Sequence, residues 1–418
     1  MRKIFLLIFC SIYTCGLLNL KANSFLGADL IQEIPKSKIS LEEAINISLK
    51  RNPKLKAAET QLAISEANIT IAKSRINPNL VSDNGIAEKT YRLGIEKTLE
   101  LGSKRTKRIE LAENNKKQIE SEISLVKLNL KTEVRQAYTM LYVLQEKYKC
   151  FKDMVESTEK LLNVAVKKEK IDNAVNLDTL QAEMMNLNAR NELENINSQL
   201  IQAQNKLNTF LNQDLRTILE LENPNGLQEE NKNTLGSLIQ KALKERPEMK
   251  INLNKQTSSI TELELAKANR IPNLSVTLGP DLVIANSVNN SIGVFIMGSM
   301  QLPLLYQGQG QIQTAKAKSF QLANEKYDLA NQIVLEVHNA YTMLNANKAK
   351  LKSFEVELNP KADLIYEKSL KCFEEGNCPV FIAINAKQSL IDTRINYLNT
   401  VADYQNSISD LARALGED

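Results

Sequence analysis

The sequence predicts a mostly α-helical fold with a small β part, built from one long unit that occurs twice. The first observation is a tandem duplication: EVRQAYTML at 133–141 returns as EVHNAYTML at 336–344, with seven of nine residues identical. The second is a pair of very long runs with helical periodicity, free of proline until Pro360. The third is a set of short stretches between them in which apolar and polar residues alternate, the period of a half-buried strand.

The N-terminus predicts a secretory signal peptide over residues 1–24. Arg2 and Lys3 precede the apolar stretch 4–20, and the small residues Ala22 and Ser24 supply a cleavage site. The mature chain is therefore expected outside the cytoplasm. Whether Cys15 carries a lipid is left open.

The duplication divides the mature chain into a first repeat, 25–220, and a second, 221–418. ISLEEAINISLKRNPKL at 39–55 is echoed 194 positions on by NTLGSLIQKALKERPEM. RINPNL at 75–80 likewise matches NRIPNL at 269–274, and residues 189–214 match 393–418 at an offset of 204. Each repeat is predicted to run helix, β-hairpin, very long helix, turn and second long helix.

The first long helix is expected from near Ser103 to Asp172 and the second from Gly308 to Gly376. At about 1.5 Å per residue each would span roughly 105 Å. Apolar residues in the first helix step by threes and fours, a heptad-like pattern with one stutter. A helix of this length with a narrow apolar seam needs partner helices along its whole length. The seam positions are Ile119, Ile123, Val126, Leu130, Val134, Ala137, Leu141, Leu144, Tyr148, Phe151, Val155, Thr158, Leu162 and Ala165.

Four strands per chain are expected, with alternation over 91–102, 271–285 and 291–305. The first strand is expected to be only four or five residues, NLVS, followed by a turn at Asp83-Asn84-Gly85. Strands with one apolar face are typical of membrane barrels. Because four strands cannot close a barrel and an open edge cannot lie in lipid, the chain must oligomerise.

Composition and motifs favour neither an enzyme nor a nucleic-acid-binding protein. The 53 basic and 49 acidic residues give a net charge of +4 without a basic stripe. No Ser-His-Asp order, phosphate-binding glycine loop or zinc spacing appears. His338, the one histidine, is expected to pack in its helix. No catalytic residue, cofactor or metal is predicted.

Two cysteines bracket the turn after the second long helix. In an oxidising compartment, Cys372 and Cys378 are expected to form a disulfide. A metal site that combines these thiols with Glu374 and Glu375 is the alternative. Cys150 is then the remaining thiol, expected in the helix seam.

Several paired segments together resemble a known family. They are LEEAINISLKRNP with LGSLIQKALKERP, RINPNL with NRIPNL, KTLELGSKR with MQLPLLYQGQG, and the paired AYTML. Their order and duplicated spacing resemble the TolC-like outer-membrane efflux protein family over nearly all of the mature chain. LELGSKR is most similar to the heavy-metal, CzcC-like branch.

The resemblance implies a homotrimer in which four strands per protomer build a twelve-stranded β-barrel in outer-membrane lipid. The long helical hairpins then form a trimeric α-barrel that extends through the periplasm. Such a protein is the exit channel of a tripartite efflux or export system. Its implied partners are a periplasmic adaptor (membrane fusion) protein and an inner-membrane transporter.

The resemblance also implies a periplasmic aperture at the turns of the long hairpins. Asp178 matches an aperture aspartate of the family and Phe373 an aromatic, with Glu374 and Glu375 beside it. Cys378 stands where the family can place a basic gating residue. The alternative for Asp178 is a helix-start acid favoured by the helix dipole.

Two further functions are left open: a periplasmic coiled-coil scaffold or spacer that never inserts in a membrane, and the outer-membrane component of type I protein secretion. The sequence identifies neither the cargo (metal, drug or protein) nor the inner-membrane pump. It also leaves open whether the short first hairpin spans the membrane.

Overall fold

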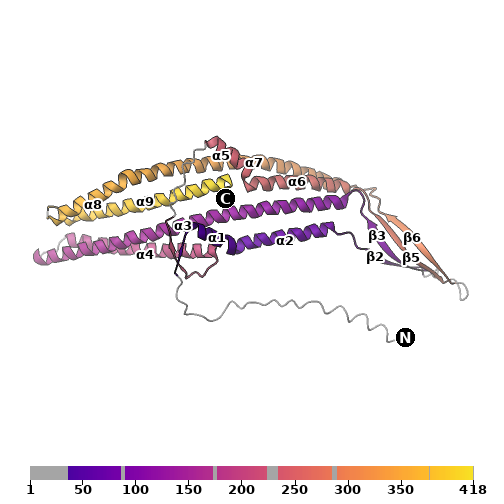
Figure 1. Ribbon diagram of the computed structural model, residues 1–418, viewed down its shortest axis with the longest axis horizontal. Coiled ribbons are helices and arrows are strands. Elements are labelled where there is room, and N and C mark those ends of the chain that lie inside the picture. The colour runs from indigo at the N-terminus through magenta and orange to yellow at the C-terminus, as the bar shows by residue number, and fades with distance from the viewer. Residues whose placement is uncertain are drawn as a thin grey trace, which may run out of the picture.

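The structure is a computed structural model that describes residues 36–85, 90–172, 177–223, 234–284, 290–375 and 377–417. The predicted signal peptide, 1–24, lies outside these ranges. The described chain is elongated, with a β-sheet at one end and the tips of two helical hairpins at the other (Figure 1). Helices run along almost the whole length between these ends.

The same order of elements occurs twice along the chain. The first half contains α1 (Leu41–Arg51), α2 (Pro53–Lys73), β2 (Asn79–Gly85), β3 (Thr90–Leu99), α3 (Lys104–Asp172) and α4 (Leu177–Leu211). The second contains α5 (Leu235–Glu245), α6 (Pro247–Ala268), β5 (Leu274–Ile284), β6 (Asn290–Met300), α7 (Gln309–Ser353), α8 (Asn359–Glu374) and α9 (Val380–Leu415).

Local sequence signals set the helix starts. Ser40 and Glu43 form a capping box at the start of α1, and Pro53 and Pro247 occupy first-turn positions of α2 and α6. Gly102 turns the chain from the sheet towards α3 with a φ of 75°. A Cβ at Gly102 would lie 2.6 Å from Ile271 Cδ1, so both the conformation and the contact require glycine.

The second long helix is not uniform, so the prediction of an uninterrupted helix from 308 to 376 is wrong. A π-helical turn, Phe354–Leu358, separates α7 from α8, and the Asn359 N–H donates to the Phe354 carbonyl. Pro360 explains the location, because proline lacks an N–H and its ring excludes the carbonyl of residue i−4, here Val356. The first long helix, α3, is continuous over 69 residues.

The largest apolar core follows the predicted seam of α3. Val134 and Leu141 are fully buried and Leu144 is 1% exposed, packed with residues of α1 and α4. The heptad-like prediction is confirmed for this helix. His338 differs from its prediction: it lies exposed on α7, so a packing role within one chain is wrong.

A second, two-stranded sheet beside α3 was not foreseen. β1 (Lys36–Ile39) pairs in parallel with β4 (Ile218–Leu221). The Tyr138 hydroxyl lies 2.9 Å from the Ile39 carbonyl and 2.8 Å from the Glu222 carbonyl, at the ends of these two strands. The tyrosine of the repeated AYTML segment therefore fixes this small sheet onto α3.

Candidate functional site: the sheet and the hairpin tips

The larger sheet has the antiparallel order β2-β3-β5-β6 and one continuous apolar face. Its register aligns one residue from each strand in a row across the sheet: Leu80, Ile95, Leu278 and Ile296. All four side chains are exposed, by 74, 59, 52 and 75% respectively. A single exposed apolar residue is ordinary, but a row across four strands is a surface that water does not favour.

The opposite face of this sheet is polar. Arg92 Nε lies 3.5 Å from Asp281 Oδ2, and the hydroxyls of Thr98 and Ser275 are 3.1 Å apart. Arg92 also lies over the Phe295 ring. The two faces thus suit two environments, one apolar and one aqueous, as strands of a membrane barrel require.

The first strand differs from its prediction. Asp83, Asn84 and Gly85 were expected to form the hairpin turn, but they belong to β2 and pair with Arg92, Tyr91 and Thr90. Asp83 Oδ2 lies 3.8 Å from Arg92 Nη1, so a cross-strand ion pair favours the strand over the turn. The strand therefore has seven described residues, and residues 86–89, which connect it to β3, lie outside the described residues.

β2 and β6 are the two edges of the sheet, each paired on one side only within the described residues. Edge strands present unpaired N–H and C=O groups. In hydrocarbon each such group would cost several kcal/mol, so an apolar environment demands further strands at both edges.

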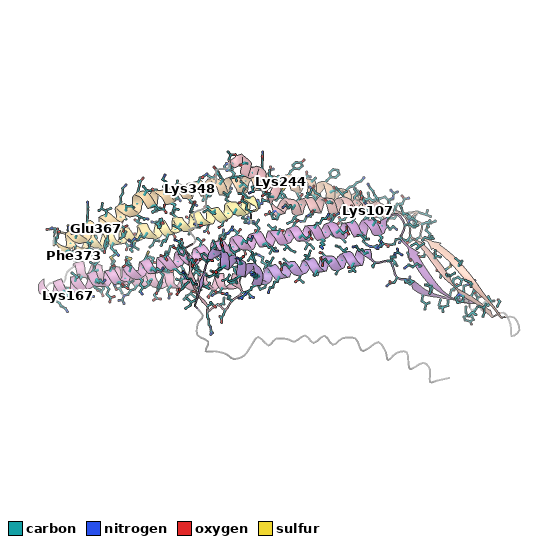
Figure 2. All side chains as sticks on the ribbon, in the orientation of Figure 1. Lys107, Lys167, Lys244, Lys348, Glu367 and Phe373 are labelled. Carbon is teal, nitrogen blue, oxygen red and sulfur yellow. A yellow bond between two sulfur atoms is a disulfide. The ribbon has the colours of Figure 1, made fainter. Side chains whose placement is uncertain are left out.

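The hairpin tips lie at the far end from the sheet, where Figure 2 labels Phe373 on one hairpin and Lys167 on the other. Phe373 is half-buried and packs against an apolar cluster that joins the two hairpins. The structure therefore places this predicted aperture residue in the packing between hairpins. The cluster comprises Leu161, Ala165, Ala182 and Ile384.

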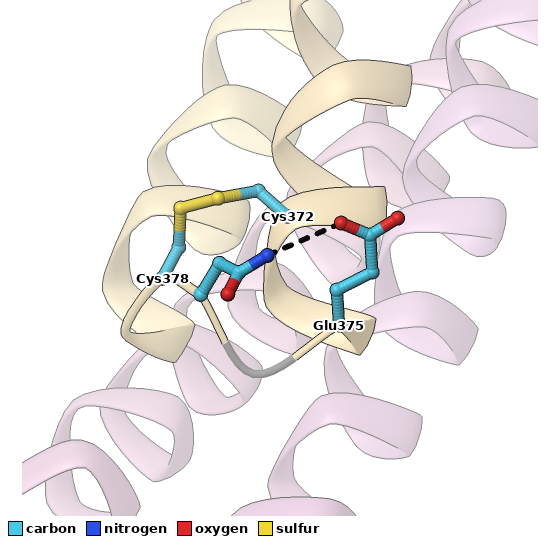
Figure 3. The surroundings of a disulfide bond; sticks show 4 residues. Cys372, Glu375 and Cys378 are labelled. Carbon is cyan, nitrogen blue, oxygen red and sulfur yellow. Dashed lines mark hydrogen bonds between the residues drawn. A yellow bond between two sulfur atoms is a disulfide. The ribbon is translucent and has the colours of Figure 1, made fainter.

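The predicted acids lie on both tips. Glu374 ends α8 and is exposed, and Glu375 accepts a hydrogen bond from Asn377 Nδ2 at 3.2 Å (Figure 3). Asp178 is the second residue of α4, and its side chain lies outside the described atoms. The ring of acids stays a prediction.

Cys372 and Cys378 are joined as a disulfide across the α8–α9 turn, with Cα atoms 5.5 Å apart (Figure 3). This distance lies inside the range that an unstrained backbone offers a disulfide. Cys150 is half-buried, and burial raises the pKa of its thiol, which makes it a poor nucleophile. The described residues contain no group of three His, Cys, Asp or Glu side chains placed to hold a metal.

An ion pair near the tips was missed from the sequence. Lys387 of α9 lies 2.9 Å from Asp153 of α3, and its ammonium is 4.9 Å from the Tyr366 ring of α8. The Lys387 side chain is only 5% exposed. A buried ammonium is stable only with a partner, so this contact ties the second hairpin to the first. A lysine in an amphipathic helix gives no sequence signal that it is buried.

Along the described parts of the chain, none of the helices combines the length and apolar character needed to cross a membrane.

Comparison with known proteins agrees with this geometry. Residues 44–213 match the outer membrane efflux protein family. The chain is 23% identical over 404 residues to the cobalt-zinc-cadmium resistance protein CzcC of Cupriavidus metallidurans, covering 94% of this chain and 95% of that protein.

Solved structures share the fold over most of the chain. A membrane protein from Pseudomonas aeruginosa superposes with a TM-score of 0.76 at 18% identity, covering 90% of this chain and 92% of the other. The Campylobacter jejuni CmeC outer membrane channel gives 0.74 at 16% identity, covering 90% and 85%. The chain with these duplicated hairpins and this two-faced sheet is therefore similar to the outer membrane efflux protein family over residues 44–213, and it shares its fold with solved outer-membrane channels.

Proposed function

We propose that this chain is one protomer of a homotrimeric exit channel, a passive duct through the outer membrane and across the periplasm. The observation that carries the proposal is the four-stranded sheet attached to a helix of 69 residues. The sheet has a continuous apolar face, and its two edge strands are each paired on one side only among the described residues. Three such sheets would supply twelve strands and leave no edge in lipid. The long helices would extend the duct by about 100 Å.

The partners follow from the shape of the duct. An outer-membrane duct has no energy source of its own, so an inner-membrane transporter must deliver the cargo. The hairpin tips, which carry the disulfide and the exposed Glu374, lie farthest from the sheet and are the part of the chain that would reach an adaptor.

The similarity to a cobalt-zinc-cadmium resistance protein supports metal cations as the cargo. A strain that lacks this chain should then be more sensitive to Co²⁺, Zn²⁺ or Cd²⁺. Unchanged metal tolerance together with loss of a secreted protein would instead favour type I secretion.

The competing function, a spacer outside the membrane, would leave the apolar face of the sheet in water. Burying such a face is worth roughly 25 cal/mol per Å². We expect the mature protein to sediment with outer membranes, to resist extraction by high salt, and to run as a heat-resistant trimer after extraction in mild detergent. A monomer released without detergent would contradict the proposal.

A further inference from the structure

A pocket lies where the second half of the chain passes from helix to sheet and back to helix. The end of α6 and the start of α7 lie side by side next to the sheet (Figure 1). Between them is a cavity of about 620 Å³, here called the junction pocket. Its polar lining includes Glu262, Asn269, Arg270, Tyr306, Gln311 and Lys318.

Arg270 gives the junction pocket an uncompensated positive charge. Lys318 Nζ lies 2.8 Å from Glu262 Oε2, so the charges of these two side chains offset one another. Arg270 is exposed and donates one hydrogen bond, to the neutral Gln307 Oε1 at 2.8 Å, and it makes no ion pair with any residue that the structure describes. A guanidinium has five N–H groups, and their geometry suits the oxygens of a phosphate. The pocket therefore favours an anion.

The loop that leads from β6 to the junction pocket is apolar and uncovered. Leu302, Leu304 and Leu305 are exposed by 61, 79 and 99%. Tyr306 follows them and lines the pocket. Three leucines this close together in water are unfavourable, and a cluster of this kind marks a surface that contacts an apolar partner. An anion-binding pocket and an apolar loop thus lie next to each other, and a phospholipid offers the chemistry that suits both.

The junction pocket also lies at the level where the apolar face of the sheet ends. Lys97 follows Ile95 by two residues on β3 and so lies on the apolar face. Its ammonium donates to the Ile76 carbonyl at 2.6 Å, before the start of β2. Lysines at the end of an apolar surface extend their charge towards polar surroundings in this way. Lys97 aligns with Val276, two residues after the start of β5, and Arg270 precedes that start by four residues.

We propose that the junction pocket binds the phosphate of an anionic phospholipid in the leaflet that faces the helices. Arg270 donates to the phosphate oxygens, and Leu302, Leu304 and Leu305 contact the acyl chains. The uncompensated charge favours a lipid with a net negative charge over a zwitterionic one, and a free phosphate ion would leave the leucines in water. The inference rests on the proposed insertion of the sheet in a membrane and adds a lipid ligand to it.

Fluorescence tests this proposal, because the chain contains no tryptophan. Leu305→Trp places a single reporter beside the pocket without replacing a residue that lines it. The detergent-extracted protein is reconstituted in vesicles of phosphatidylcholine and phosphatidylglycerol. One of the two lipids carries brominated acyl chains, at equal bromine content, and bromine quenches a tryptophan that it contacts. Stronger quenching is expected when phosphatidylglycerol carries the bromine.

Two variants in the Leu305→Trp background identify the residue responsible. Arg270→Gln should lower the preference for phosphatidylglycerol about fivefold, the factor that corresponds to about 1 kcal/mol for one basic residue at an anionic surface. Lys316→Gln is the matched control, because it removes the same charge from an exposed residue of α7 that does not line the pocket. It should keep the preference.

Three results would overturn the proposal. The first is equal quenching of the Leu305→Trp reporter by the two brominated lipids. The second is an equal loss of preference in Arg270→Gln and Lys316→Gln. The third is binding of inorganic phosphate by the protein in detergent together with equal quenching by the two lipids, which would assign the pocket to a soluble anion.

Ile296→Trp separates this proposal from the channel itself. Ile296 lies on the apolar face of the sheet and is 75% exposed, so its reporter should be quenched by either brominated lipid. If the Ile296 reporter is quenched and the Leu305 reporter is not, the sheet enters the bilayer and the lipid site is refuted. If neither reporter is quenched by either lipid, the sheet stays outside the bilayer and the channel is refuted as well.

Discussion

At the scale of single residues, Tyr138 shows what one side chain of the repeated segment contributes. Its ring is fully buried and its hydroxyl lies against two strand-end carbonyls. Its counterpart Tyr341 is half-buried and makes no hydrogen bond through its hydroxyl among the described residues. The two tyrosines therefore allow the same substitution to be compared at a bonded and an unbonded site.

We expect Tyr138→Phe to destabilise the protein by about 0.5–1.5 kcal/mol, because the hydrogen bond that its buried hydroxyl donates to a strand-end carbonyl is lost. Tyr341→Phe should change stability by less than about 0.5 kcal/mol. Thermal unfolding in detergent would measure both. Equal effects at the two positions would show that the hydroxyl does not anchor the small sheet.

Tyr138 also predicts how the stability of the protein depends on pH. Burial raises the pKa of Tyr138 to about 12. Since the unfolded tyrosine ionises near its ordinary pKa of about 10, this group's contribution is complete below pH 10 and is lost as the pH rises towards 12. Wild type should thus lose more stability over this range than Tyr138→Phe, as alkaline unfolding curves would show.

Asp178 carries the aperture hypothesis. Three copies of this acid around one axis would form a negative ring that favours cations. Asp178→Ala should raise single-channel conductance and lower cation selectivity, whereas Glu194→Ala, farther along the same helix, should do neither. If both variants conduct as wild type does, Asp178 is only a helix-start acid.

At the scale of elements, the π turn between α7 and α8 marks a difference between the two halves. The offset between equivalent residues rises from 203 at 336–344 to 204 at 393–418, so the second half contains one extra residue between these segments. A π turn accommodates one extra residue in a helix without rotating the faces on either side of it.

Deleting Val356 should therefore convert the π turn to α-helix and preserve assembly. Deleting Gln332 from regular α7 should rotate every later side chain by about 100° and abolish the trimer. Trimer yield on native gels would compare them. Equal loss of trimer in both deletions would show that the turn does not absorb the extra residue.

The disulfide belongs to the α8–α9 turn. We expect Cys372 and Cys378 to resist alkylation in exported protein until reductant is added, and their joint replacement by alanine to cost about 2 kcal/mol, as for a short loop. Cys150→Ala should leave the turn unaffected. Mass spectrometry of the alkylated protein would show whether Cys372 and Cys378 are modified. Modification of both thiols without reductant would refute the disulfide.

Elements with strong local periodicity could be predicted from the sequence. The expected start near Ser103 and end at Asp172 agree with α3, because a long run of heptad-like spacing leaves little ambiguity. The pair β1 and β4 was missed, since each has four residues and its partner lies far away in the chain. Asp83-Asn84-Gly85 has turn propensity, but cross-strand pairing with Arg92 outweighs it.

The features of the candidate site likewise divide into those with a local sequence signal and those that depend on tertiary packing. The disulfide follows from two cysteines around a turn, a local signal. The ion pair of the buried Lys387 with Asp153 and the packing of Phe373 depend on how two hairpins meet, and the sequence of a single helix does not reveal this.

At the scale of the whole molecule, each half is incomplete by itself and so is the chain. Among the described residues, the two edge strands of the sheet are each paired on one side only, and Leu187 of α4 and Leu335 of α7 are exposed apolar side chains. A closed ring of three chains would pair the strands at both edges of the sheet and would bury the exposed apolar side chains of α4 and α7. The polar face of the sheet, with Arg92 and Asp281, would then line the lumen.

The most direct test is single-channel recording of the purified, detergent-extracted protein in a planar lipid bilayer. If three chains close one duct, discrete conductance steps should appear from the trimer fraction of a sizing column and not from monomer. A trimer that never conducts, or steps that arise from monomer alone, would contradict the central claim.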